Sequence, residues 1–372
     1  MLLRVLPWCK ILYICILVKM KLYSMRFVVF REVVVAFLGV MFFAPRLAAQ
    51  TGFCVMEWNV ENLFDPYDDP QKQDDEFTPT AVRRWTWHKF MKKLENVGKT
   101  IAAAGGVAVP DLVALCEVEN DTVLEKLTKV SVLKRAGYRY FVTSSLDSRG
   151  INVALLYRPL SFAPVCTEII RPNFNGLPRK FSRDVLLVSG RVVTGDTLDV
   201  FVCHFPSRLD RYKQGARYRE RLARQVGRKA DSLFKVRRHA NVIITGDFND
   251  VPQSPLLCRH LGARPVLQDS SEFRDDRLFN LMYSSRGDGS VKGTYCYKGK
   301  WETIDNFVVS GRLLRKSFPL NLSRDGCRIF AAPFLLVEKD GEKVPFRTYN
   351  GMRYLGGFSD HLPLVARFSF SW

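Results

Sequence analysis

Four short apolar runs of this chain each end directly in a polar residue, and this repeated pattern constrains the fold most strongly. Residues 53–58 lead into Asn59, residues 111–116 into Glu117, residues 198–203 into His204, and residues 241–245 into Gly246-Asp247. Runs of this length suit buried strands, and the carboxyl ends of strands in α/β sheets are where ligand-contacting side chains gather. The pattern therefore predicts an α/β protein with a polar site at one rim of its strands.

Amphipathic helical segments alternate with the apolar runs, which indicates one domain over residues 50–372. Apolar residues recur every three or four positions over residues 88–104 and predict a helix there. A long basic helix is expected over residues 214–234, and a hairpin over residues 185–204 around Gly195-Asp196. Further strands are expected at 138–143, 152–157, 306–309 and 364–370, with polar surface loops at 65–80 and 270–303.

Residues 1–49 predict an export signal that precedes this domain. A short basic segment from Met25 to Arg31 is followed by an apolar stretch from Val33 to Phe43, and Ala49 suits cleavage before Gln50. Translation from Met25 would make residues 1–24 a start-site artefact. An uncleaved anchor is the alternative, although the stretch is shorter than the ~20 residues that a spanning helix needs. We therefore expect a periplasmic or secreted protein.

The chain is strongly basic, with a formal charge of +19. Residues 1–49 hold seven Lys/Arg and one Glu, which leaves +13 on the remainder. This excess favours a polyanionic partner such as nucleic acid or an acidic membrane surface, with a basic but unspecialised surface as the alternative. Seven cysteines follow residue 50 without a Cys-x-x-Cys or a zinc-spaced Cys/His pair, which argues against a zinc site.

The polar residues at the strand ends are those that phosphate-ester hydrolysis needs. Hard divalent ions prefer carboxylate and amide oxygens, so Glu117 with Asn59 suits Mg²⁺. Asp247 could orient or deprotonate a water molecule, and Asn249 could hold a phosphate oxygen. The imidazole of His204 could donate a proton, accept one or clamp the phosphate, and the same holds for His361 near the C-terminus. Each motif by itself also fits an ordinary turn.

Six of these motifs occur in an order that resembles a known superfamily. They are Asn59-Val60-Glu61-Asn62, Glu117, His204-Phe205-Pro206-Ser207, Gly246-Asp247-Phe248-Asn249-Asp250, Ile304-Asp305-Asn306 and Ser359-Asp360-His361. Together they resemble the endonuclease/exonuclease/phosphatase superfamily, the deoxyribonuclease-I-like metal-dependent phosphoesterases. The resemblance spans residues 53–370, and it rests on the joint order of the motifs rather than on any one of them.

The resemblance implies an α/β four-layered sandwich of two packed mixed β-sheets flanked by helices. It also implies a hydrolase of phosphate ester bonds that uses Mg²⁺, with Mn²⁺ as an alternative. The implied metal site consists of Glu117 as principal ligand with Asn59, Glu61 and Asp360. The implied catalytic residues are Asp247 and Asn249 on water and phosphate, His204 on the phosphate side, and Asp305, which would orient His361 and favour its charged form.

The substrate is less constrained than the reaction. Tyr295 and Trp301 lie with lysines in an aromatic-basic loop that could stack on a base or sugar, and a packed loop with solvated lysines is the alternative. We expect a monomeric, exported, endonuclease-type phosphodiesterase whose partner is a phosphate-ester substrate, most readily nucleic acid. The alternatives are a sphingomyelinase-like or small-molecule phosphoesterase, and a non-catalytic binding module on the same fold.

Overall fold

The fold is described from a computed structural model that covers residues 52–177, 182–208, 215–266, 273–283 and 291–371, without the side chains of residues 324 and 325. The expected export signal, with Met25 and the cleavage site at Ala49, lies outside these residues. One compact unit comprises Gln50–Trp372. No helix within the described ranges is long and apolar enough to cross a membrane.

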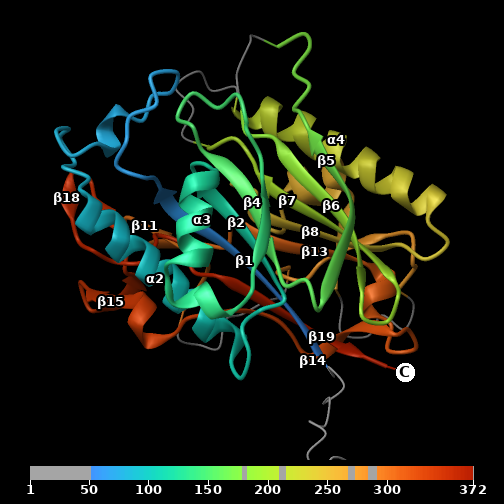
Figure 1. Cartoon of the computed structure of the whole chain (residues 1–372). Helices are drawn as coiled ribbons and strands as arrows, with labels where there is room; N and C mark the ends of the chain where they lie inside the picture. The colour runs from blue at the N-terminus through green and yellow to red at the C-terminus, as the bar shows by residue number, and fades with distance from the viewer. Residues whose placement is uncertain (1–51, 178–181, 209–214, 267–272, 284–290, 372) are drawn as a thin grey trace, which may run out of the picture. The chain divides into compact units, whose positions relative to one another are not determined.

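Two mixed β-sheets form the centre of this unit (Figure 1). The first sheet contains, in spatial order, β14 (Leu320–Ile329), β19 (Leu364–Phe370), β1 (Gly52–Leu63), β2 (Leu112–Val118), β4 (Asn152–Tyr157) and β3 (Arg139–Val142). The second contains β5 (Phe162–Ile170), β6 (Val185–Val192), β7 (Thr197–His204), β8 (Asn241–Asp247), β13 (Asp305–Ser310), β10 (Leu278–Asn280) and β9 (Ala263–Pro265). The pairs β1–β2, β7–β8 and β9–β10 are parallel, and the other pairs are antiparallel.

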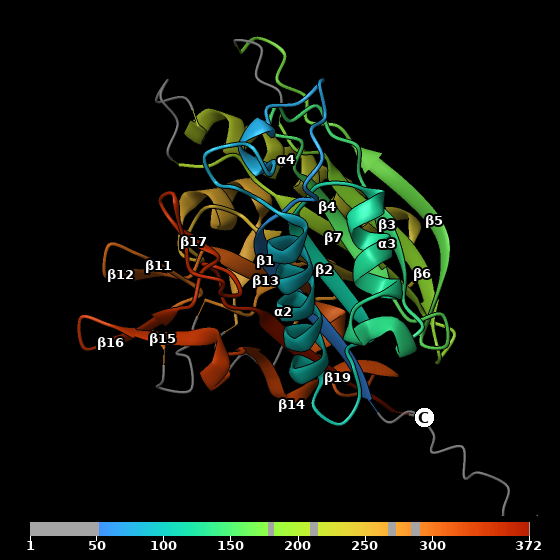
Figure 2. The ribbon, with the colours of Figure 1, turned by 60° about the vertical axis from the view of Figure 1, so that its left-hand side comes forward.

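Helices cover the outer face of each sheet, which confirms the predicted four layers (Figures 1 and 2). The helices α2 (Trp87–Gly105) and α3 (Asp121–Lys129) lie on the first sheet, and α4 (Gly215–Val236) lies on the second. The expected spacing of apolar residues holds, because Phe90, Leu94 and Val97 of α2 are fully buried. Short helical turns occur at Asp75–Phe77, Val132–Arg135, Leu256–Leu261, Gly311–Leu314 and Pro333–Leu335.

The central strands are buried on both faces, as strands between two covering layers must be. In β1, every residue from Phe53 to Val60 is buried, and β8 is buried throughout. The larger core cluster fills the space between the sheets and under α2, whereas the smaller one joins the second sheet to α4. The polar strand ends therefore emerge from rigid, densely packed scaffolding.

The prediction of a polar loop over residues 270–303 was partly wrong. Leu278–Asn280 is a buried strand, because it pairs with β13 and Asn280 donates to the Asn306 side chain (2.9 Å). Tyr295–Tyr297 (β11) and Lys300–Glu302 (β12) form a hairpin. Two more hairpins, β15 (Leu336–Lys339) with β16 (Glu342–Pro345) and β17 (Tyr349–Asn350) with β18 (Arg353–Tyr354), lie near β11–β12 in Figure 2. Long strands β5 and β14 were also not foreseen.

Gly246 allows β8 to approach β7 closely at the rim. Its φ of 142° lies in a region that favours glycine, and a Cβ atom here would lie 1.8 Å from the carbonyl oxygen of Cys203. The register places Cys203 opposite Gly246 and His204 opposite Asp247. A side chain at Gly246 would therefore force apart the strand ends that carry these two residues.

We expect Gly246→Ala to lower the free energy of unfolding by roughly 3 kcal/mol, because the clash adds to backbone strain. Gly195→Ala is the matched control, since Gly195 also has a positive φ (83°) but a methyl group added there would have no atom within 4 Å. That variant should lose only about 1 kcal/mol. Urea denaturation measures both, and equal losses would contradict the steric argument.

Candidate active site

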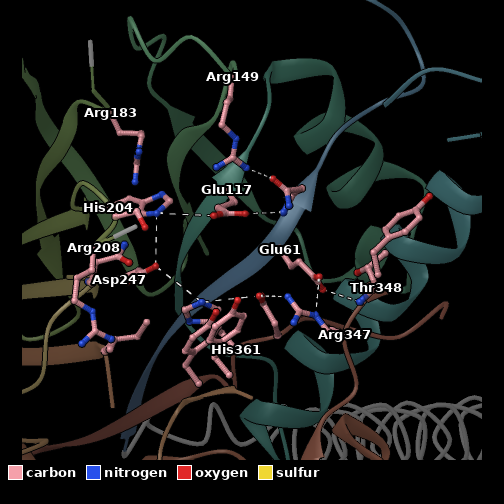
Figure 3. Close-up of a pocket in the computed structure, with 18 of the residues that line it drawn as sticks. Glu61, Glu117, Arg149, Arg183, His204, Arg208, Asp247, Arg347, Thr348 and His361 are labelled. Carbon is pink, nitrogen blue, oxygen red and sulfur yellow. Dashed lines mark hydrogen bonds and ion pairs between the residues drawn. The ribbon is translucent and has the colours of Figure 1, made fainter. Parts of the chain in front are cut away.

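A pocket of about 630 Å³ opens at the rim where the polar strand ends meet (Figure 3). The predicted site residues that line it are Glu61, Glu117, His204, Asp247, Asn249, Tyr295, Asp360 and His361. Asn59 and Asp305 are buried and make direct hydrogen bonds to lining residues. Residues from distant parts of the chain therefore share one site.

Three polar contacts cross from one sheet to the other at this rim. Asn59 of β1 donates through Nδ2 to Oδ2 of Asp247 in β8 (3.0 Å). Glu117 of β2 lies 3.9 Å from His204 of β7, measured between Oε1 and Nε2. His361, which precedes β19, lies with Nδ1 2.8 Å from Oδ2 of Asp305 at the start of β13. Each pair thus takes one residue from each sheet.

Two β-bulges direct the acidic residues of the first sheet into the pocket. The register of β1 against β2 shifts between Asn59 and Leu63, and that of β2 against β4 shifts between Cys116 and Val118. Glu61 and Glu117 lie within these shifts with φ values of 51° and 64°. Such a conformation is uncommon for residues other than glycine, and bulges commonly redirect a side chain beside an active site. The bulge also extends β1 beyond the predicted end at residue 59.

His361 is held as a cation by its neighbours. Burial disfavours the charged imidazole, but Asp305, with Asp360 and Asp247, outweighs that cost and holds the pKa of His361 well above its usual value. Ser359 fixes the main chain here, because its Oγ donates to the carbonyl of Asn59 (2.7 Å) and accepts from the His361 N–H (3.1 Å). The sequence-based prediction that Asp305 orients His361 matches this geometry.

His204 is held neutral, although two carboxylates face it. Burial lowers the pKa of His204 well below its usual value, and Arg183 and Arg149 lower it further. The Nε2 atom lies 3.5 Å from Asp247 Oδ2, which is too long for a strong ion pair. The two histidines therefore occupy opposite protonation states, and paired groups with separated pKa values are typical of acid–base sites.

Asp247 lies between the two histidines, and its pKa is close to neutral pH. Its Oδ1 accepts from the Asn249 N–H (2.8 Å) and its Oδ2 accepts from Asn59. Burial raises the pKa of Asp247 to about 7, against the opposing effect of His361. Glu57 lies deeper between the sheets, and neither carboxyl oxygen has a hydrogen-bond partner among the described residues. Burial, Asp305 and Asp247 raise the pKa of Glu57 well above its usual value.

Glu117 is the carboxylate best suited to a divalent cation. Burial opposes its ionisation, but Arg149, His361 and Arg183 outweigh this effect, and the pKa of Glu117 is lowered. Its Oε2 accepts only one strong bond in the described region, from the Asn62 N–H (2.9 Å). Asn59 pairs with Cys116, the residue before Glu117, and a carboxylate and an amide oxygen at adjoining strand ends fit the ligand chemistry of Mg²⁺.

The other two predicted metal ligands, Glu61 and Asp360, instead contact Arg347. Asp360 Oδ2 lies 2.7 Å from Arg347 Nη2, and Glu61 Oε1 lies 3.5 Å from Arg347 Nε. Glu61 Oε2 also accepts from the Thr348 N–H (2.6 Å). A compact group of Asp247, Asp305 and His361 resembles a ligand set. The Nδ1 of His361 is already bonded to Asp305 (2.8 Å), and its Nε2 lies 4.0 Å from Oδ2 of Asp247, so Asp305 positions the ring and its Nε2 side faces Asp247.

The two predicted aromatic contacts differ in position. Tyr295 lines the pocket with its ring centroid 4.7 Å from that of His361. Trp301 is partly buried against the core and is not among the lining residues, so the structure does not place it at the substrate. Its side chain packs inward because β12 pairs with β11 and turns this residue toward the interior. Tyr297 lines the pocket in its stead.

Sequence reasoning missed the five arginines that the described residues contribute to the pocket lining, of which Arg83 lies over the ring of Tyr349. Arg149, Arg183, Arg208 and Arg347 surround the acidic residues on several sides (Figure 3). Arg149 belongs to the Asp147-Ser148-Arg149-Gly150 segment, which by sequence reads as a turn. Nothing in a basic sequence with many arginines separates these four from solvated ones, because loops rather than strand ends carry them.

Comparisons with known proteins agree with this architecture. The model of the Endonuclease/Exonuclease/phosphatase family matches residues 54–369. Curated protein sequences gave no match. Among solved structures, D. rerio TDP2 humanized by 14 mutations has a TM-score of 0.51 at 16% identity, over 86% of this chain and 99% of that one.

Two further solved structures share the fold. The endonuclease/exonuclease/phosphatase from Bacteroides vulgatus has a TM-score of 0.51 at 16% identity, over 87% of this chain and 100% of that one. The human Nocturnin catalytic domain with bound sulfate anion has a TM-score of 0.50 at 18% identity, over 86% of this chain and 95% of that one. With the family match over nearly the whole described unit, the chain belongs to the endonuclease/exonuclease/phosphatase family, whose members hydrolyse phosphate esters.

Proposed function

We propose that this protein is an exported, Mg²⁺-dependent phosphodiesterase of the endonuclease type. The observation that carries the proposal is that Glu117, His204, Asp247 and His361 meet in one pocket, with His204 3.9 Å from Glu117 and 3.5 Å from Asp247, and His361 bonded to Asp305 (2.8 Å). The lowered pKa values of Glu117 and His204 and the raised pKa of His361 agree with this geometry. This arrangement offers a cation ligand, a proton acceptor and a proton donor at a single rim. The charge of +13 beyond residue 49 supports a polyanionic substrate such as nucleic acid.

In the proposed reaction, each residue has a role set by its protonation state. Asp247, with a pKa of about 7, orients and deprotonates the attacking water. Cationic His361 stabilises the charge that develops on the phosphate, and Asn249 contributes an amide at the same strand end. A divalent cation bound by Glu117 and Asn59 would polarise the phosphate and neutralise part of its charge. His204 borders the phosphate from the β7 side.

A substrate panel tests the proposed function. The protein is assayed on plasmid DNA, RNA, sphingomyelin and phosphorylated inositols, with Mg²⁺, with Mn²⁺ and with chelator. Metal-dependent cleavage of DNA or RNA that weakens as salt rises is the expected result. Cleavage confined to sphingomyelin or inositol phosphates would overturn the nuclease assignment, and inactivity on every substrate would favour a binding module.

We propose export on the basis of the residues 1–49 pattern and of a compact unit that comprises Gln50–Trp372. The expected outcome is a mature N-terminus at Gln50 when the full chain is expressed in its host. Mass spectrometry of the N-terminal peptide makes this measurement. Recovery of intact residues 25–49 in the membrane fraction would show an uncleaved anchor instead.

Glu117→Gln should reduce metal-dependent hydrolysis by roughly 100-fold or more, because it removes the proposed cation ligand's charge. It should also weaken Mg²⁺ binding measured by calorimetry, which is independent of turnover. Glu168→Gln is the matched control, since the Glu168 side chain is exposed on β5 and pairs with Lys229. Equal behaviour of the two variants would remove Glu117 from the metal site.

Asp305→Asn should make kcat fall at a lower pH on the alkaline side of the pH profile than in the wild type. Asp305 raises the pKa of His361, so the wild-type imidazole stays charged well above the ordinary histidine pKa of 6.5. Without that carboxylate, burial lowers the pKa, and kcat should fall as pH rises above about 7. The measurement is a kcat profile from about pH 5 to about pH 10.

Asp199→Asn provides the control for this profile. Asp199 is also a fully buried carboxylate, but it pairs with Arg237 (3.0 Å) away from the pocket. Its loss should cost stability without moving the alkaline limb. An unchanged alkaline limb in Asp305→Asn would show that His361 does not act as a cation.

A further inference from the structure

Two arginines converge on the Glu117 side of the pocket. Arg149 lies in the connection that precedes β4, and Arg183 lies just before β6. Both line the pocket, and Figure 3 shows their guanidinium groups above Glu117 and His204. The positive charges of both arginines lower the pKa of Glu117 and the pKa of His204. The roles proposed above use the charges of these arginines but assign neither side chain a contact with the substrate.

One buried acid fixes both arginines. Asp147 Oδ2 lies 3.3 Å from Nη1 of Arg183, and Asp147 Oδ1 accepts from the Arg149 main-chain N–H (3.0 Å). Arg183 also donates through Nη2 to the carbonyl of Phe205 (2.8 Å) and is 9% exposed. A guanidinium fixed in this way is built into the fold, unlike a solvated surface arginine.

The local charges leave this side of the pocket positive. Asp147 balances Arg183, but the Arg149 side chain bonds to the neutral amide oxygen of Asn62 and forms no ion pair within the described residues. The Nε of Arg183 has no hydrogen-bond partner among those residues either. Once a cation takes up the charge of Glu117, the Arg149 charge has no counterpart. A negatively charged group of the substrate could then pair with Arg149.

We propose that Arg149 and Arg183 form a second anion subsite, which binds a phosphate group next to the scissile one. This inference rests on the proposed function. The scissile phosphate is assigned to Asp247, Asn249 and His361, and the labelled Asp247 and His361 lie on the other side of Glu117 in Figure 3. Arginine pairs phosphate through two parallel N–H bonds, which selects for a substrate with at least two neighbouring phosphates. That neighbour is a chain-internal phosphodiester or a terminal phosphate.

Short thymidine oligonucleotides test the subsite. TpT has one phosphate, TpTpT adds an internal phosphate, and pTpT and TpTp add a terminal one at either end. With Mg²⁺, the protein should show a kcat/KM at least about 10-fold higher on one of the longer substrates than on TpT. In Arg149→Gln this ratio should fall to within about 2-fold, whatever the change on TpT itself.

Arg191→Gln is the matched control, because Arg191 is an exposed arginine of β6 that does not line the pocket. It should leave the ratio unchanged. Arg183→Gln removes the cation that pairs with buried Asp147, so it is compared only if thermal unfolding shows a folded protein. The Arg149→Gln variant carries the test because its side chain is exposed and supports no described ion pair.

Binding separates failure of the subsite from failure of the proposed function. With Mg²⁺ present, calorimetry compares thymidine 3′,5′-bisphosphate with both thymidine monophosphates, none of which contains a phosphodiester to cleave. Arg149→Gln should weaken binding of the bisphosphate by about 10-fold and should weaken binding of the monophosphates less. Turnover of TpT with an unchanged substrate ratio in Arg149→Gln would overturn the subsite alone. If no substrate is turned over, the proposed nuclease function is wrong. Equal binding of the bisphosphate by the wild type and by Arg149→Gln would show that the subsite is wrong as well.

Discussion

The contact between the two sheets at one rim is the constraint on which the site depends. Asn59 reaches Asp247, Glu117 faces His204, and His361 bonds to Asp305, each across the sheet interface. The second sheet alone brings His204 near Asp247 (3.5 Å), but Glu117 and Asn59 come from the first sheet. The packing of the apolar layer between the sheets therefore sets the distances between the catalytic groups, so a change in the core would also change the geometry of the site.

Backbone strain is concentrated where the two sheets meet the pocket. Seven residues other than glycine have positive φ in the described chain, and four of them are Glu61, Asn62, Glu117 and Asn249. Strain of this kind costs on the order of 1–3 kcal/mol per residue and persists only where surrounding structure enforces it. The parallel pair β1–β2 supplies that support, because both strands are buried except at their ends.

The residues at the strand ends were predictable, and those on loops were not. Asp247 and His204 directly follow apolar runs, so strand periodicity alone places them at the rim. Arg183 contacts Asp147, which lies 36 residues away in sequence, and such a contact leaves no local pattern. Arg149 lies in a turn whose sequence does not mark it as part of the pocket. The sequence around Trp301 allowed either stacking on a substrate or a packed loop with solvated lysines, and the pairing of β11 with β12 places Trp301 against the core.

The burial of acids beneath the rim limits which of them carry charge. Glu57, Asp305 and Asp247 influence one another in a region without solvent, and like charges there are costly. The raised pKa of Glu57 keeps this carboxyl group neutral, which removes one negative charge. The cationic His361 offsets the negative charge of Asp305 and Asp247. Glu117 lies at the edge, where arginines keep it ionised. Asp305 pairs with His361 and Asp360 with Arg347, so Glu117 is the carboxylate left for a divalent cation, and Arg149 is left for the substrate.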